Sequence, residues 1–252
     1  MNLSIIKKEV RENFYAMKGN VWLIIIAIIF SIMSYSFVSV KELSLLAQTE
    51  VIVTMGKLVL ALGLLITIVL SAVTFSNEKE ESTLESLLLT PVPKMQLAIG
   101  KLIAVLLMGI SVFIIALPYI ATLSYGTGLI MRATLFILII GSIVAFSYAC
   151  ISISLSIILG SSKNSIITSI IFLILTALPG LLSTSIKKVG FGAAIEKISP
   201  LSNTFNLMKA VIIQKQGFDG MLKFIIPILI FSVLAYLFLI YGTKKIAFKG
   251  GE

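Results

Sequence analysis

The side chains that perform most enzyme chemistry are scarce in this sequence. The chain has 252 residues, with no histidine and a single cysteine, Cys150. Histidine is the most common general base and metal ligand, and one cysteine cannot form a disulfide within the chain. The sequence offers no metal-ligand cluster and no Ser–His pair for nucleophilic catalysis. These residue types therefore disfavour catalysis by this chain.

A phosphate-binding loop is also missing. Gly56-Lys57 and Gly100-Lys101 are each followed by leucine and lack the upstream glycine of the G-x-x-x-x-G-K-[ST] motif. We therefore expect no enzyme activity, no cofactor and no metal in this chain. If the protein does work that requires ATP, another chain must hydrolyse it.

The carboxylates avoid the apolar blocks of the sequence. None of the eleven acidic residues lies in the core of a block long enough to cross a bilayer. Ion-driven carriers usually keep an intramembrane carboxylate for the coupling ion. The pattern disfavours a secondary carrier, although a sodium site made of backbone carbonyls stays open.

The apolar blocks predict the fold that must position any functional residue. The composition is 58% hydrophobic and 12% charged, far from that of a soluble domain, and a span needs about 20 helical residues. We predict an all-α, polytopic membrane protein with six transmembrane helices in one permease domain, 1–252. The expected spans are 21–40, 54–76, 97–123, 130–160, 164–183 and 223–243.

The N-terminal segment, 1–19, is predicted to be an amphipathic helix outside the hydrocarbon. Ile6, Val10 and Phe14 recur at spacings of four, and charged residues fall between them. Two interpretations stay open. The helix lies in the headgroup plane with its basic residues toward phosphates, or it packs on the protein's own cytoplasmic face.

Charge predicts the orientation. With the N-terminus inside, basic residues are slightly more numerous on the cytoplasmic side, and both chain ends are basic. We expect both termini in the cytoplasm and an outer loop, 184–222, before the last span. The net charge of +9 indicates orientation and attraction to lipid headgroups rather than binding of nucleic acid.

The stretch between spans two and three, 77–91, carries the most information. Asn77 with Glu80, and Ser82 with Glu85, each resemble a capping box that could begin a helix ending before Pro91. Such a helix would be acidic on one side with a stripe of leucines, which suits a groove on a protein partner. The alternative is that it packs against the chain's own basic N-terminal segment.

This stretch resembles the cytoplasmic loop of ATP-binding-cassette (ABC) permeases of the type-2 export class, which reads approximately E-[KR]-E-x-G-T-L-E-x-L-L-x-[ST]-P-V before a Gly-Lys. The matching residues here are Glu78, Lys79, Glu80, Glu81, Thr83, Leu84, Glu85, Leu87, Leu88, Thr90, Pro91, Val92, Gly100 and Lys101. Ser82 stands where the class has glycine. A weaker match is the Pro-Leu segment 198–209, which resembles the amphipathic segment before the sixth span of that class.

The resemblance implies a set of partners. Such permeases pair with a second copy or a paralogue and bind two ABC ATPase subunits, which hold ATP and magnesium. The coupling helix after span two is seated in a cleft of the ATPase. The resemblance implies that the ATPase-coupling residues are Glu78, Glu80, Glu81, Thr83, Leu84, Glu85, Leu87, Leu88 and Pro91.

Two further stripes invite a functional or a packing interpretation. Small residues in the fourth span predict close helix packing, with a role in the transport path as the alternative: Gly141, Ala145, Ala149, Ser152, Ser156 and Gly160. A mildly polar stripe in the second span could line a path, or its hydroxyls could bond their own helix: Gly63, Thr67, Ser71 and Thr74.

The sequence thus predicts the transmembrane subunit of an ATP-driven ABC exporter in the plasma membrane of a prokaryote. The alternatives are an immunity or binding scaffold that does not transport, and an ion-coupled secondary carrier. No residue identifies the substrate.

Overall fold

The described part of the chain is a bundle of long helices. The computed structural model describes residues 3–15, 18–39, 45–84, 92–181, 195–214 and 217–246. Its helices are α1 (Leu3–Tyr15), α2 (Lys18–Val38), α3 (Leu45–Val73), α4 (Ser76–Glu80), α6 (Lys94–Leu123), α7 (Ile130–Leu159), α8 (Ser162–Leu181), α11 (Pro200–Ile212) and α12 (Phe218–Lys244). No β-strand occurs within these ranges, which confirms the all-α prediction.

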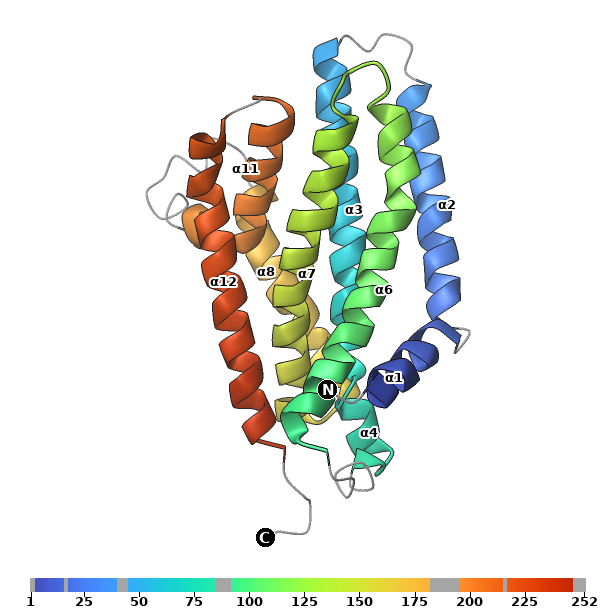
Figure 1. Cartoon of the computed structure of the whole chain (residues 1–252), viewed down its shortest axis with the longest axis vertical. Helices are drawn as coiled ribbons and strands as arrows, with labels where there is room; N and C mark the ends of the chain where they lie inside the picture. Colours follow the sequence, from blue (N-terminus) through green and yellow to red (C-terminus); the bar gives the residue numbers. More distant parts are fainter. Residues whose placement is uncertain are drawn as a thin grey trace.

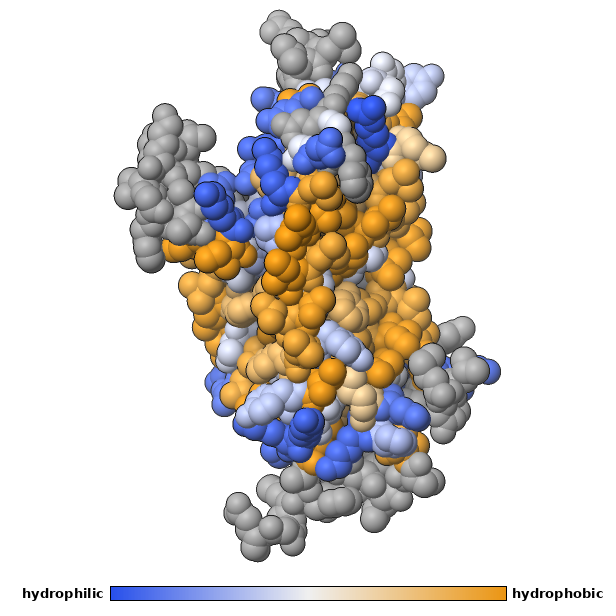
Figure 2. Space-filling model, turned by 60° about the vertical axis from the view of Figure 1, so that its left-hand side comes forward, coloured by the Kyte–Doolittle hydropathy of each residue, from blue (hydrophilic) through white to orange (hydrophobic). Residues whose placement is uncertain are grey.

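Six of the helices are long and apolar enough to cross a membrane. These candidate spans are Gly19–Val38, Gln48–Glu80, Lys94–Leu123, Ile130–Leu159, Ser162–Gly180 and Asp219–Lys244. On the face shown in Figure 2, an apolar band covers the middle of the molecule, and hydrophilic side chains gather toward both ends. The predicted number and order of spans are therefore confirmed.

The ends of several spans differ from the prediction because helices continue past the apolar blocks. The second span was expected to begin at residue 54, but helix already surrounds Gln48. The Gln48 side chain donates hydrogen bonds to the carbonyls of Leu123 and Tyr125 at 3.2 Å. Hydrogen bonds of this kind extend a helix beyond the hydrocarbon, which hydropathy alone does not detect. The sequence Pro179-Gly180 does not break the fifth span, since α8 runs through both residues to Leu181.

α7 is the central and most buried span, and it packs between α3, α6 and α12 (Figure 1). Glycines let α3 and α6 approach closely. A Cβ atom at Gly63 of α3 would clash with the ring of Phe113, and one at Gly109 of α6 would clash with the hydroxyl of Thr67. Phe113, at 0% exposure, belongs to a core that continues across these helices.

The two ends of the bundle carry different elements. α1, α4 and the last turn of α12 lie at one end, here called the terminal end, and α11 lies in the other half (Figure 1). The predicted outer loop, 184–222, therefore contains a packed helix in its described part. α11 is too short to cross a bilayer, begins at the N-cap Ser199, and buries most of its side chains against α8 and α12. The last span also starts earlier than expected, with α12 beginning at Phe218.

Candidate coupling site

The segment predicted to couple to an ATPase begins directly after α3. α4 ends at Glu80, and Ser82 has a φ of +57°, the only positive φ of a non-glycine residue in the described chain. The amide of Thr83 donates to the Glu78 carbonyl at 2.9 Å and closes this turn. Glycine adopts a positive φ without steric cost. The tight turn that explains the glycine of the class is thus present here on a serine.

The predicted capping box at Asn77 and Glu80 is wrong. Asn77 lies inside α4, whose N-cap is Phe75 without a side-chain cap. Both side chains instead reach the first residue of α8. The Asn77 Oδ1 accepts a hydrogen bond from the Ser162 hydroxyl at 2.5 Å, and the Glu80 Oε1 accepts one from the Ser162 amide at 2.8 Å. A carboxylate there satisfies a free amide and is favoured by the helix dipole.

A continuous helix from Asn77 onward is also wrong, because the backbone leaves the helix at Glu81 and Ser82. Leu84 is helical again, but the other predicted capping box, Ser82 with Glu85, lies partly outside the described residues and stays a prediction. The remaining predicted coupling residues lie outside the described residues: Glu85, Leu87, Leu88 and Pro91.

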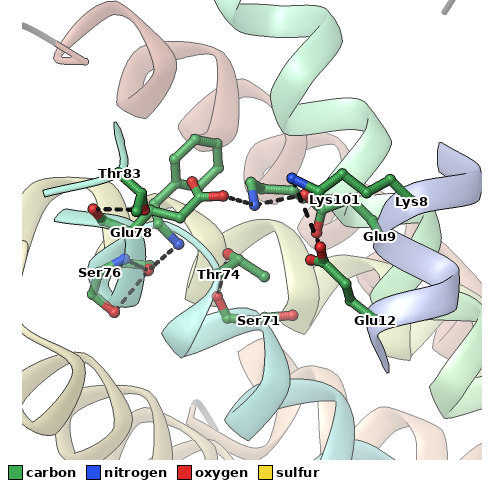
Figure 3. A network of polar contacts seen from close by, with 11 residues as sticks. Lys8, Glu9, Glu12, Ser71, Thr74, Ser76, Glu78, Thr83 and Lys101 are labelled. Carbon is green, nitrogen blue, oxygen red and sulfur yellow. Dashed lines mark hydrogen bonds and ion pairs between the residues drawn. The ribbon is translucent and has the colours of Figure 1, made fainter. Parts of the chain in front are cut away.

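A buried lysine joins three helices on one side of α4 (Figure 3). Lys101 of α6 is 2% exposed. Its Nζ donates to the Glu78 Oε1 of α4 at 2.6 Å and to the Glu9 Oε1 of α1 at 2.9 Å, and it lies 5.4 Å from the centre of the Phe75 ring. Buried charges are tolerated when they are paired in this way, and removing one partner typically costs about 3–5 kcal/mol. Lys101 therefore fixes α1 and α4 to the third span.

On its other side α4 is held by hydroxyls of α7. The Ser156 Oγ accepts hydrogen bonds from the backbone amides of Phe75 and Ser76, at 3.1 and 2.9 Å. These amides lie between the end of α3 and the first turn of α4, where backbone N–H groups have no hydrogen-bond partner within the helix. α7 then ends at Gly160, whose φ of +61° is left-handed and whose missing side chain leaves room for Lys79. A lysine beside a helix C-terminus is electrostatically favourable.

The predicted coupling residues divide into anchors and exposed groups. Glu78 is turned inward to Lys101, so the structure gives it an anchoring position rather than an exposed one. Glu80, Glu81 and Thr83 are exposed. Leu84 is half-buried against a small apolar core that includes Phe75. The acidic surface that α4 offers at the terminal end therefore consists of Glu80 and Glu81.

One side of the N-terminal helix packs on the protein, against α6 and α2, and this contact is compatible with both interpretations of 1–19. Glu9 is 8% exposed, and Phe14 packs against the main core. Lys7, Lys8 and Arg11 stay exposed. The alternative that α4 meets the N-terminal segment is also partly realised, since α1 and α4 share Lys101.

The small-residue stripe of the fourth span lies inside the bundle. Its members from Gly141 to Ser156 are buried: Gly141, Ala145, Ala149, Ser152 and Ser156. A Cβ atom at Gly141 would contact Leu60 and Phe113 at 3.2 Å. Gly160 differs from the others, because its left-handed backbone ends the helix. These positions agree with the packing interpretation, and a role in the path has no support from them.

The polar stripe of the second span is also enclosed by the chain. Thr67 and Ser71 are both 0% exposed. The Thr67 hydroxyl donates to the carbonyl of Gly63 at 2.7 Å, and that of Thr74 donates to the carbonyl of Ser71 at 2.8 Å. Backbone carbonyls thus satisfy the hydroxyls of Thr67 and Thr74, whereas the buried Ser71 Oγ has no hydrogen-bond partner among the described residues. A role of the stripe in lining a path stays a prediction.

Sequence reasoning missed the partners that hold the coupling segment. In the sequence, Glu9 is one of the charged residues that fall between the apolar positions of 1–19, and Lys101 is part of a Gly-Lys motif. The available signal was a lysine placed two turns inside an apolar helix, since such a charge requires a partner. Within the described ranges, no group of three or more His, Cys, Asp or Glu side chains could hold a metal ion.

Comparison with known proteins agrees with this architecture. The model of the family described as ABC-2 family transporter protein matches residues 14–180, which is more than half of the chain. The match includes the first five spans, α4 and Lys101. No curated protein is significantly similar to the chain in sequence. The predicted family is confirmed, and the chain belongs to the ABC-2 transporter family as a multi-pass membrane subunit of an ABC transporter.

Proposed function

We propose that this chain is the transmembrane subunit of an ATP-driven exporter, and that α4 docks on a separate ATPase subunit. One observation carries the proposal. α4 is hydrogen-bonded to α6, α7 and α8, while Glu80 and Glu81 stay exposed at the terminal end. An exposed acidic tip on a firmly held segment suits a partner with basic side chains, because charge complementarity orients such docking.

The anchors of α4 give docking a mechanical consequence. Lys101 links α4 to the third span and to α1, and Ser162 links it to the first turn of the fifth. A displacement of α4 by an ATPase would strain these short hydrogen bonds unless the spans moved with it. Closure of the ATPase pair would then reposition the third and fifth spans together, which is the movement an alternating-access exporter needs.

A second permease subunit completes the proposed complex. α8 has the lowest hydropathy of the six spans, yet little of it is buried within the chain. Its exposed side includes Asn164 and Thr168, whose polar groups are less costly against protein than against lipid tails. We assign this face to a second copy of the chain or a paralogue, with the transport path between the two halves.

The remaining features of the complex follow from the same proposal. The terminal end faces the cytoplasm of a prokaryotic cell, with both termini inside, because the ATPase must reach α4 there. ATP and magnesium bind on the two ATPase subunits, and this chain contributes no catalytic residue. The outward direction of transport rests on the resemblance to the export class.

Co-purification tests the proposal. The chain would be co-expressed with candidate ABC ATPases and extracted in mild detergent. We expect an ATPase to co-purify with the wild type, and the charge reversal Glu81→Lys to lower its recovery about tenfold or more. Glu50→Lys is the matched control, because Glu50 is also exposed but lies near the other end of the bundle.

The outcomes separate the alternatives. If recovery of the ATPase is the same for Glu81→Lys as for wild type, α4 is not the docking segment. If no ATPase is recovered with any variant and transport persists without one, the exporter proposal fails in favour of a carrier. A scaffold would bind its ligand without transport.

A further inference from the structure

The helix α1 presents a basic face at the terminal end of the bundle. Lys7, Lys8 and Arg11 are exposed, and so is Glu12, whose Oε1 lies 3.7 Å from the Lys8 Nζ. The remaining charged residue of the helix is Glu9, whose carboxylate is directed inward to Lys101. The exposed side of α1 therefore carries three cations and one anion.

The Glu9–Lys101 pair strengthens this asymmetry. With both glutamates exposed, α1 would have a net side-chain charge of +1. Because Lys101 removes Glu9 from the surface, the exposed side chains sum to +2. Attraction between a cationic helix and an anionic surface increases about fivefold for each basic residue near that surface. The buried pair thus raises the affinity of α1 for an anionic surface without adding a basic residue.

The position of α1 indicates which anionic surface it meets. α1 ends at Tyr15, directly before the first span, which begins at Gly19. Trp22 lies within the first turn of that span and is 50% exposed, and tryptophan is enriched at the level of the lipid headgroups. Beyond it, Ile24 and Ile28 are exposed as expected for side chains that face lipid. α1 therefore lies at headgroup depth, tilted away from the bundle axis (Figure 1).

We infer that the basic face of α1 binds the headgroups of anionic phospholipids in the leaflet at the terminal end. Lys7, Lys8 and Arg11 supply the charge, and Glu9 is kept out of the site by Lys101. An acidic protein surface would also attract these residues, but headgroup depth beside the first span favours the membrane. The inference is independent of any ATPase, so it can succeed or fail separately from the proposed function.

The native tryptophan provides a local assay, since Trp22 is the only tryptophan in the chain. The full-length protein would be reconstituted in phosphatidylcholine bilayers that contain phosphatidylglycerol, with bromine on one lipid or the other. Brominated lipid quenches tryptophan on contact, so the two quenching curves give the relative binding constant of the anionic lipid near α1. We expect brominated phosphatidylglycerol to quench Trp22 more strongly at equal mole fraction.

Substitutions then locate the site. The triple variant Lys7→Gln, Lys8→Gln and Arg11→Gln should lose the preference, by about fivefold per charge removed. The matched control removes three exposed basic residues from other helices at the same end, and should keep the preference: Lys163→Gln, Lys244→Gln and Lys245→Gln. Equal loss in the control would show a general effect of net charge and overturn the inference.

A pair of single variants tests the part played by Lys101. Glu12→Gln should raise the relative binding constant about fivefold, because it removes an exposed anion. Glu9→Gln should change it less than about twofold, because the Glu9 carboxylate is buried against Lys101 and does not lie on the exposed face. Equal effects of the two variants would overturn the assignment of Glu9.

Salt provides a test that needs no substitution. Raising the ionic strength from 0.1 to 1 M shortens the screening length from about 10 to about 3 Å. The preference of the wild type should then disappear, because the three cations are exposed. Equal quenching by the two lipids at low salt would refute the inference outright.

Discussion

Replacing Lys101 with methionine is the sharpest perturbation of the coupling site. Methionine keeps most of the side-chain volume but removes the charge that Glu9 and Glu78 share. The two carboxylate oxygens lie no more than 5.5 Å apart, the sum of their distances of 2.9 and 2.6 Å from the Nζ. At an effective dielectric constant of about 20, two like charges at that separation repel by about 3 kcal/mol. We therefore expect Lys101→Met to lose at least about 3 kcal/mol of stability, since removing one partner of a buried pair costs about 3–5 kcal/mol.

The assay is thermal unfolding of the purified protein in detergent, followed by size-exclusion chromatography of samples heated in steps. A loss of 3 kcal/mol corresponds to a melting temperature lower by about 6–12 °C in a chain of this size. Adding Glu9→Gln and Glu78→Gln to the variant should recover most of the stability, because no buried charge remains.

Lys94→Met provides the matched control. Lys94 lies on the same helix and is exposed, and its Nζ donates to the carbonyl of Ile246 at 2.5 Å. Removing this single hydrogen bond should lower the free energy of unfolding by less than about 1.5 kcal/mol. The electrostatic account of the site is refuted if Lys101→Met is as stable as wild type, or if the neutral triple variant is as unstable as the single one.

Three more predictions concern the backbone and the orientation. Ser82→Gly should raise stability by about 1 kcal/mol, because glycine removes the cost of a positive φ that serine bears. Ser82→Val should lower it, because a β-branched side chain tolerates this φ least; equal melting temperatures of the three proteins would contradict the strained turn. Gly160→Ala should lower stability by about 1–2 kcal/mol, because alanine would have to adopt the left-handed φ of +61°. An unchanged melting temperature would show that the turn after α7 tolerates a side chain. Tyr125 is 80% exposed, so Tyr125→Cys should react with an impermeant maleimide added to intact cells, whereas Glu81→Cys should not. The native Cys150 is buried and should give a low background. The reverse labelling pattern would invert the proposed orientation.

The helical bundle could be predicted because it follows from strong local signals. Six apolar blocks of sufficient length determine the number and order of the spans. The exact ends could not be predicted, because side chains such as Gln48 continue a helix with hydrogen bonds to residues far along the chain. α11 overlaps the segment 198–209 that resembles the amphipathic segment of the class, but its packing could not be predicted, for a related reason. Its 13 residues are too short for a span, and only contact with α8 and α12 explains why they are buried.

The position of the candidate coupling segment was inferred from the sequence, but its contacts could not be. The order of acidic residues, leucines and Pro91 located the segment between spans two and three. Its internal structure depended on tertiary partners. The local sequence around Glu80 does not tell whether its carboxylate caps its own helix or the first turn of α8. In the structure it caps α8, because it accepts a hydrogen bond from the Ser162 amide. Glu9 and Lys101 are separated by 92 residues, so local patterns could not pair them.

The central claim is that the exposed tip of α4 touches an ATPase in the assembled transporter. A photoactivatable crosslinking amino acid at Glu81 tests this most directly, in native membranes that contain the complex. We predict a crosslinked product of permease and ATPase from that position and none from Tyr125 at the opposite end. Crosslinking from Tyr125 but not from Glu81, or from neither position while an ATPase co-purifies, would contradict the account.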